Sequence, residues 1–149
     1  MSVSVREQDF DVAAEIAALT AARTDIGAVA SFIGLVRDLH EGGLESMTLE
    51  HYPGMTEAAL ADIVSQAQGR WPLLGVRVIH RVGRLRPGDS IVLVLVAAAH
   101  RGDAFAACAF IMDYLKTQAP FWKKEASAAG GHWVDAKDSD DAAAARWKV

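Results

Sequence analysis

The sequence predicts an α+β protein with a mixed or antiparallel sheet. Helical and strand patterns alternate along its 149 residues, but without the regular strand-helix-strand rhythm of a parallel sheet. Two apolar strand patterns are joined by the short turn 86–89, which contains Pro-Gly and favours an antiparallel pair. No internal repeat or low-complexity linker divides the chain, so we expect residues 1–149 to form a single domain.

The first half of the chain is expected to contain two helices and two strands. Val12, Ile16 and Leu19 lie on one side of an alanine-rich helical pattern. Thr56 can cap the second helix, which the Trp-Pro pair at 71–72 ends. The expected elements are a helix over 11–22, a buried strand over 27–36, a polar turn over 40–43, a half-buried strand over 47–51 and a helix from Thr56 to about Arg70.

The second half is dominated by a long helix that follows a very apolar strand. Phe105, Ala109, Met112 and Lys116 recur on one face of this helix, and Pro120 ends it. The expected elements are strands over 76–82 and 90–99, a helix from Arg101 to Gln118, a basic and aromatic connector over 121–126, a turn at 130–131, a short strand over 132–136 and a last helical turn or two over 140–147.

Composition argues against several classes of function. A net charge of −4 argues against a general nucleic-acid-binding protein, which would carry a broad basic surface. The single cysteine, Cys108, allows neither an internal disulfide nor a Cys-rich zinc site, and the five histidines lack metal-ligand spacing. Phosphate-loop and dinucleotide motifs are absent, so no cofactor or metal is expected. The longest apolar run, 91–99, is too short for a membrane helix, and residues 1–10 resemble no signal peptide; we expect a cytoplasmic protein.

Two groups of basic residues are candidates for a site. His100 and Arg101 lie where an apolar strand ends and a helix begins, and there the free backbone N–H groups and the helix dipole favour an anion. The alternative for Arg101 is a side chain that merely extends into solvent. Lys116, Lys123 and Lys124 form the second group, around an Ala-Pro-Phe-Trp segment.

A lysine stem among Met, Phe and Trp side chains loses hydration, which lowers the pKa of its amine and makes it usable as a base or nucleophile. A lysine that snorkels at a helix end is an equal alternative for Lys116. Arg37 and Lys137 each follow an expected strand and are weaker candidates for ligand contact. Cys108 lies between alanines and is expected to be a core residue and not a reactive thiol.

The two basic groups are too far apart to share a small ligand within one chain. Arg101 and Lys116 are fifteen positions apart on one expected helix, which is roughly 22 Å at about 1.5 Å per residue. If both belong to one site, that site is expected to be shared between two chains.

Four stretches closely resemble the large subunit of molybdopterin synthase, and the match extends over nearly the whole chain. They are LEHYPGMT at 49–56, VIHRVG at 78–83, AHR at 99–101 and FIMDYLKTQAPFWKKE at 110–125. The last motif is highly specific. The resemblance implies an α/β-hammerhead fold, a homodimer of large subunits and a small ubiquitin-like subunit docked at each end of a heterotetramer.

The resemblance also implies a chemistry. The small subunit carries a thiocarboxylate on its C-terminal Gly-Gly, and two sulfurs pass in turn to cyclic pyranopterin monophosphate, which becomes the dithiolene of molybdopterin. The implied catalytic residues are Lys116 and Lys123. The implied substrate pocket consists of Leu35, Val36, Arg37, His100, Arg101, Lys116, Lys123, Lys124, Glu125 and Lys137.

This sequence departs from the family pattern at Lys137, where the family often has arginine. A lysine keeps the charge but loses the planar fork of the guanidinium group. Two other functions remain as alternatives: a related anion-binding or docking subunit without transfer activity, and an unrelated enzyme that forms a Schiff base through a lysine. Retention of Lys116 and Lys123 argues against the first alternative.

Overall fold

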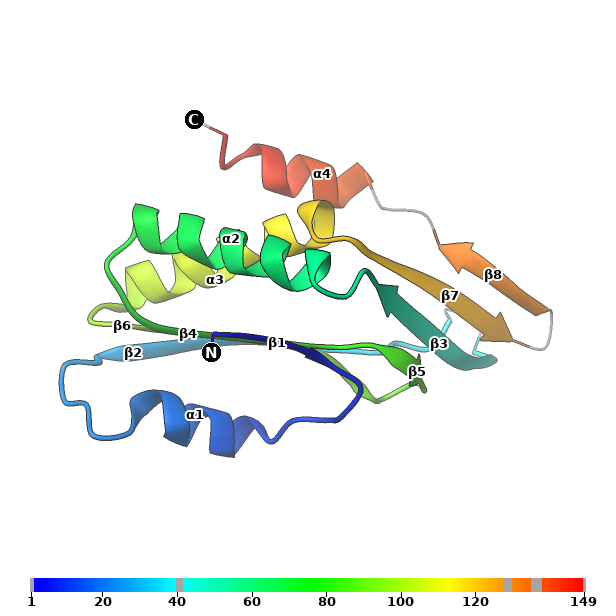
Figure 1. The fold of residues 1–149 in the computed structure, drawn as a ribbon, viewed down its shortest axis with the longest axis horizontal. Coiled ribbons are helices and arrows are strands. Elements are labelled where there is room, and N and C mark those ends of the chain that lie inside the picture. The colour runs from blue at the N-terminus through cyan, green and yellow to red at the C-terminus, as the bar shows by residue number, and fades with distance from the viewer. Residues whose placement is uncertain (1, 40–41, 128–129, 135–137, 149) are drawn as a thin grey trace.

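A computed structural model describes residues 2–39, 42–127, 130–134 and 138–148. It contains two four-stranded sheets and four helices (Figure 1). In chain order the elements are β1 (Val3–Arg6), α1 (Val12–Thr20), β2 (Ala28–Leu35), β3 (Leu44–His51), α2 (Met55–Arg70), β4 (Leu73–Arg81), β5 (Gly83–Leu85), β6 (Ser90–Ala98), α3 (Arg101–Gln118), β7 (Phe121–Ser127), β8 (Gly130–Val134) and α4 (Asp138–Ala145).

The first sheet has the strand order β1-β4-β6-β2 and carries helices on both faces (Figure 1). β1 runs parallel to β4, whereas the pairs β4–β6 and β2–β6 are antiparallel, so the predicted α+β class with a mixed sheet is confirmed. Side chains of β6 alternate between the faces. Val92, Val94 and Val96 pack in the core beneath α2 and α3, whereas Leu93 and Leu95 pack against the face that α1 covers.

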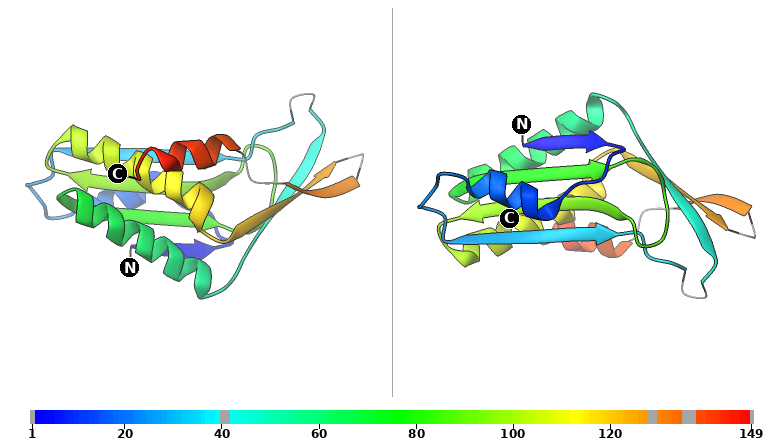
Figure 2. Two further views of the ribbon diagram at one scale, coloured as in Figure 1. Left: turned by 90° about the horizontal axis from the view of Figure 1, so that it is seen from above. Right: turned by 90° about the horizontal axis from the view of Figure 1, so that it is seen from below.

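The second sheet has the order β5-β3-β7-β8 and extends away from one end of the first (Figure 2). All its pairs are antiparallel. Its inner face packs on a separate small core of Val36, Leu44, Met47, Leu49, Val82 and Leu85. The chain passes from the first sheet to the second at Gly83, whose φ of +90° is accessible to glycine at little cost.

Several boundaries differ from the sequence-based expectation. Residues 121–126, expected as a connector, belong to strand β7, and Gly130 and Gly131, expected as a turn, are paired within β8. β1 and β5 were not expected, and β4 begins at Leu73. The expected strand over 132–136 ends at Val134, with 135 and 136 outside the described residues, and the last helix spans Asp138–Ala145.

These errors have two physical causes. β7 carries two lysines and a glutamate, so it lacks the apolar character by which a strand is recognised. β1 and β5 are only four and three residues long, too short for a periodic pattern.

No helix within the described ranges is long and apolar enough to cross a membrane.

Candidate functional site

Helix α3 separates the two basic groups that the sequence singled out. It begins directly after β6 with exposed His100 and Arg101, and it runs unbroken to Gln118. His100 has extended backbone angles and makes no side-chain cap, so the first-turn N–H groups of the helix are not capped by its ring. Lys116 lies exposed in the last turn, roughly 22 Å from Arg101 at about 1.5 Å per residue.

Strand register shows which other predicted residues lie near each end. β2 is antiparallel to β6, with Ala28 opposite Ala98 and Leu35 opposite Ser90. Leu35 to Arg37 therefore lie at the end of the sheet far from the start of α3, the end to which α3 returns with Lys116 (Figure 2). Within one chain the structure does not bring His100 and Arg101 to the lysines.

Three residues of the predicted pocket follow one another at that far end but differ in environment. Leu35 is 55% exposed and Arg37 is also exposed. Val36 is buried in the core of the second sheet, and its backbone N–H donates to the carbonyl of Asp89 at 2.8 Å. The side chain of Val36 therefore anchors this segment, while its neighbours present their side chains to solvent.

Strand β7 distributes the remaining predicted residues over two faces. Phe121, Lys123 and Glu125 lie on one face because side chains alternate along a strand, and all three are half-buried. Lys123 is paired across the strands with Leu49, a residue of the second core. Lys124 points to the opposite face and is exposed. Lys137 lies outside the described residues.

The bend between α3 and β7 places Lys116 and Lys123 on either side of Pro120, and it is held by two contacts. The buried hydroxyl of Thr56 donates to the carbonyl of Pro120 at 3.0 Å and accepts the backbone N–H of Tyr52 at 3.0 Å. The rings of Tyr52 and Trp122 lie 4.7 Å apart. The direction in which β7 leaves the helix is therefore fixed from the turn before α2.

A third contact at the bend involves His80, which the sequence reasoning did not single out. Its ring stacks on Phe121 with centroids 3.8 Å apart and planes 18° apart. The side chain is 5% exposed, and the pKa of His80 is lowered to about 4, mainly by burial; the hydrogen bond to the Arg81 carbonyl opposes this shift, and the charges of Lys116 and His51 add to it. The sequence feature that could have identified His80 is a histidine at the end of an otherwise apolar strand.

Cys108 lies on the buried face of α3, and burial raises the pKa of its thiol to about 11. The thiol therefore stays protonated near neutral pH and is a poor nucleophile. Among the described residues, no group of three or more His, Cys, Asp or Glu side chains is placed to hold a metal ion.

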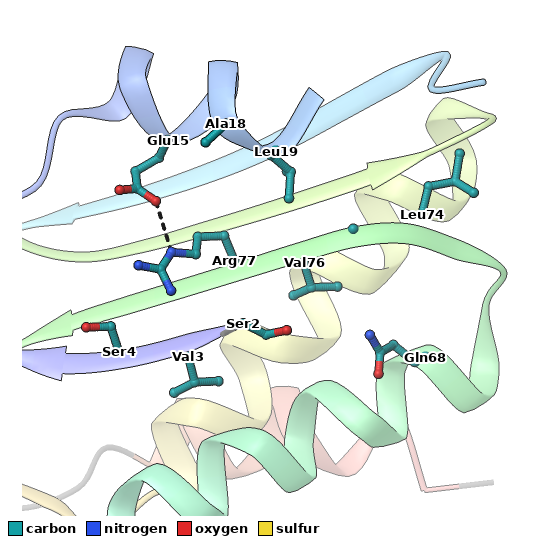
Figure 3. A pocket seen from close by; sticks show the side chains of 11 residues that line it. Ser2, Val3, Ser4, Glu15, Ala18, Leu19, Gln68, Leu74, Val76 and Arg77 are labelled. Carbon is teal, nitrogen blue, oxygen red and sulfur yellow. Dashed lines mark hydrogen bonds and ion pairs between the residues drawn. The ribbon is translucent and has the colours of Figure 1, made fainter. Parts of the chain in front are cut away.

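A cavity of about 900 Å³ lies elsewhere, between α1, α2 and the edge formed by β1 and β4 (Figure 3). Its floor carries the ion pair between Arg77 and Glu15, with 2.9 Å between Nε and Oε1. None of the residues predicted for the site lines this cavity. Arg77 is the only basic residue among the described residues that line the cavity, and it is already paired with Glu15, so the bend between α3 and β7 is the better candidate for an anionic substrate.

Comparisons with known proteins identify the family to which this chain is similar. The family model described as "MoaE protein" matches residues 5–118. The molybdopterin synthase catalytic subunit of Ralstonia nicotianae is 64% identical over 99% of this chain and 85% of its own length. The structure of the molybdopterin biosynthesis MoaE protein from Burkholderia ambifaria superposes with a TM-score of 0.86 at 56% identity, covering 99% of this chain and 98% of that one.

A more distant structure shares the fold alone. The complex of subunits 1 and 2 of the molybdopterin-converting factor from Helicobacter pylori contains a chain that is 18% identical, with a TM-score of 0.74 and coverage of 93% of this chain and 92% of that one. The family model covers far more than half of the residues, and the match to the Ralstonia relative covers 99% of this chain. This chain therefore belongs to the MoaE protein family.

Proposed function

We propose that this chain is the catalytic subunit of a molybdopterin synthase. It transfers sulfur from the C-terminal thiocarboxylate of a small ubiquitin-like partner to cyclic pyranopterin monophosphate, forming the dithiolene of molybdopterin. The observation that carries the proposal is the pair Lys116 and Lys123, set on either side of a bend that Thr56 and Tyr52 hold in place. Relatives whose match covers 99% of this chain carry the name molybdopterin synthase catalytic subunit.

The two lysines suit a reaction between two anions. A thiocarboxylate and a phosphorylated pterin repel each other, and ammonium groups offset this repulsion and stabilise negative charge that develops during transfer. Lys116 is placed to position the incoming thiocarboxylate. The half-buried Lys123, beside Phe121 and Leu49, is placed to hold the pterin or to transfer a proton. Cys108 carries no sulfur in this scheme, so the sulfur arrives on the partner.

The anion-binding end of α3 completes the site when it comes from a second copy of the chain. β2 is an edge strand that exposes Phe32, Ile33 and Leu35, and the first turns of α3 expose Phe105. An unpaired sheet edge with exposed apolar side chains is suited to association with a second copy. A two-fold axis across β2 reverses the strand direction in the partner, which brings His100 and Arg101 of one copy toward the lysine end of the other.

The complete assembly in this proposal is a dimer of this chain with one small subunit at each end, acting in the cytoplasm. Neither nucleic acid nor a membrane takes part. The partner is recognised by its C-terminal Gly-Gly, whose lack of side chains lets its backbone approach Lys123 closely. Co-purification from the native cell should return a small protein with this C-terminus, in the cytoplasmic fraction.

The decisive experiment combines the purified chain, the thiocarboxylated partner and the pterin substrate, and measures molybdopterin. The matched control is the same partner with an ordinary C-terminal carboxylate, which should bind but give no product. A complex that forms and never turns over would favour the alternative of a docking subunit without transfer activity. Borohydride trapping of a carbonyl substrate on Lys116 or Lys123 would favour a Schiff-base enzyme.

A further inference from the structure

His80 occupies the junction of the two sheets, directly beneath the bend that joins α3 to β7. It lies near the end of β4, and its parity with Val76 and Val78 turns its ring toward the face that α2 and α3 cover. Phe121, the ring on which it stacks, packs against both the core of the first sheet and that of the second. The contact therefore couples the two halves of the fold at one point.

The hydrogen bond of the His80 ring fixes its tautomer and its orientation. Nδ1 lies 2.8 Å from the carbonyl oxygen of Arg81, and because a carbonyl only accepts, Nδ1 carries the proton. The ring is thus tied to the backbone of its own strand and cannot rotate away from Phe121 without losing this bond. An aliphatic side chain at this position would fill space but would lack both the flat face and the tether.

The surroundings of His80 require an uncharged ring. Lys116 on α3 and His51 on β3 are the titratable groups whose charges act on it, and both disfavour a second cation. Its side chain is almost fully buried, which disfavours the charged form further. His80 consequently behaves as a rigid neutral plate between the catalytic end of α3 and the first residue of β7.

We propose that His80 is a positioning residue of the two-lysine site: its stacked ring holds Phe121, and thereby sets where Lys123 stands relative to Lys116. Lys123 follows Phe121 by two residues on the same face of β7, so a displacement of Phe121 carries directly to it. Thr56 fixes the carbonyl of Pro120, and His80 fixes the side chain that follows. The role of His80 rests on the proposed function, since it acts through the lysines and touches no substrate.

The test is a set of variants in the assembled synthase. His80→Ala should lower kcat by about tenfold or more while KM and partner affinity stay within about twofold, because the lysines are misplaced but still present. His80→Phe, which keeps a flat ring, should recover most of the kcat, whereas His80→Gln, which keeps a donor but no ring, should not. Val78→Ala, in the same strand and core, controls for lost stability and should keep kcat within about twofold.

A double-mutant cycle with Phe121→Ala separates positioning from general damage. If His80 acts through Phe121, the variant His80→Ala/Phe121→Ala should lose no more kcat than the worse single variant. Multiplicative losses, or a folded His80→Ala protein with kcat near that of the wild type, would overturn the inference. Failure of His80→Phe to recover kcat would equally exclude stacking as the mechanism.

A second readout stands apart from turnover. With 13C-labelled lysine side chains, the NMR chemical shifts of the Lys123 side chain should change in His80→Ala and remain as in the wild type in Val78→Ala. If the wild-type chain makes no molybdopterin, the proposed function fails, and these chemical shifts alone decide the role of His80. Unchanged Lys123 chemical shifts in a folded His80→Ala protein would reject that role.

Discussion

At the residue scale, Lys116 and Lys123 carry the charge on which the proposed transfer depends. Replacement of Lys116 by alanine removes the ammonium group at the end of α3 without touching the core, because the side chain is exposed. We expect Lys116→Ala to lower turnover by about a hundredfold or more with fold and partner binding intact. Lys123→Ala should also lose most turnover, and Lys148→Ala, an exposed lysine near the C-terminus, serves as the charge control.

Product formation is the measurement, accompanied by partner affinity and thermal unfolding of each variant. Near-normal turnover in Lys116→Ala would remove this residue from the mechanism. If Lys123→Ala changed partner affinity alone, Lys123 would be a docking residue and not a catalytic one.

The buried thiol leads to a second expectation at this scale. Because burial raises the pKa of Cys108 to about 11, the thiolate needed for attack or for carrying sulfur is scarce at neutral pH. Cys108→Ala should therefore retain most of the turnover, at a small cost in packing. Loss of all activity in a folded Cys108→Ala protein would point to a persulfide mechanism instead. Slow alkylation of the native thiol provides an independent measurement.

The depressed pKa of His80 makes stability depend on pH in a defined window. The unfolded chain binds a proton on this histidine near pH 6.5, whereas the folded chain binds it only near pH 4. The contribution of the buried, neutral His80 to the free energy of unfolding is therefore complete above about pH 6.5. It is lost as the pH falls through 4, a change on the order of 3 kcal/mol. Urea unfolding at several pH values should show this slope in the wild type and a shallower one in His80→Phe; parallel profiles would contradict it.

At the scale of elements, α4 is held on α3 through the residues that follow it. The indole Nε1–H of Trp147 donates to Asp113 Oδ2 at 2.6 Å, and its rings meet Phe110 at 5.6 Å and Trp71 at 5.7 Å. Trp147→Ala should lower the free energy of unfolding by about 3 kcal/mol, because it removes a large packed ring and a bond to a carboxylate. Trp147→Phe should cost clearly less.

Denaturant unfolding of the two Trp147 variants provides the measurement. Arg146→Ala is the control, because its ion pair with Asp113 is largely exposed on the arginine side and such pairs contribute little. The Arg146 guanidinium also lies 4.7 Å from the centroid of the Trp147 ring. Equal losses in Trp147→Ala and Arg146→Ala would therefore show that the contacts of Arg146 with Asp113 and with the indole, and not the packing of the indole on Phe110 and Trp71, attach α4.

The same scale shows what sequence reasoning could and could not recover. Long elements with a clear period, such as α3 and β6, were predicted with nearly correct bounds because burial imposes a pattern on them. β7 was not, since only one of its faces packs on the core and lysines occupy both faces. The lysines themselves were predicted from their setting and the family motif. His80 was not, because its stacking partner lies 41 positions away in the chain.

At the scale of the whole molecule, the distance between the two ends of α3 sets the arrangement of the site. One chain cannot bring Arg101 and Lys116 to one small substrate, so the proposal places Arg101 of one copy beside Lys116 of the other. Heterodimers of differently altered chains can test this directly. They are prepared by co-expression with two affinity tags and verified before assay.

Two heterodimers give opposite results under the two arrangements. In a dimer of Arg101→Ala with Lys116→Ala, shared pockets place both lesions in one pocket and leave the other intact, so up to about half of the activity per dimer should return. In a dimer of the wild type with the double variant, shared pockets receive one lesion each, and activity should be lost. Pockets built within one chain predict the reverse for both dimers, because each single variant then disables its own pocket while the wild-type chain keeps a whole one. Retained activity in the second dimer and none in the first would therefore assign the site to a single chain.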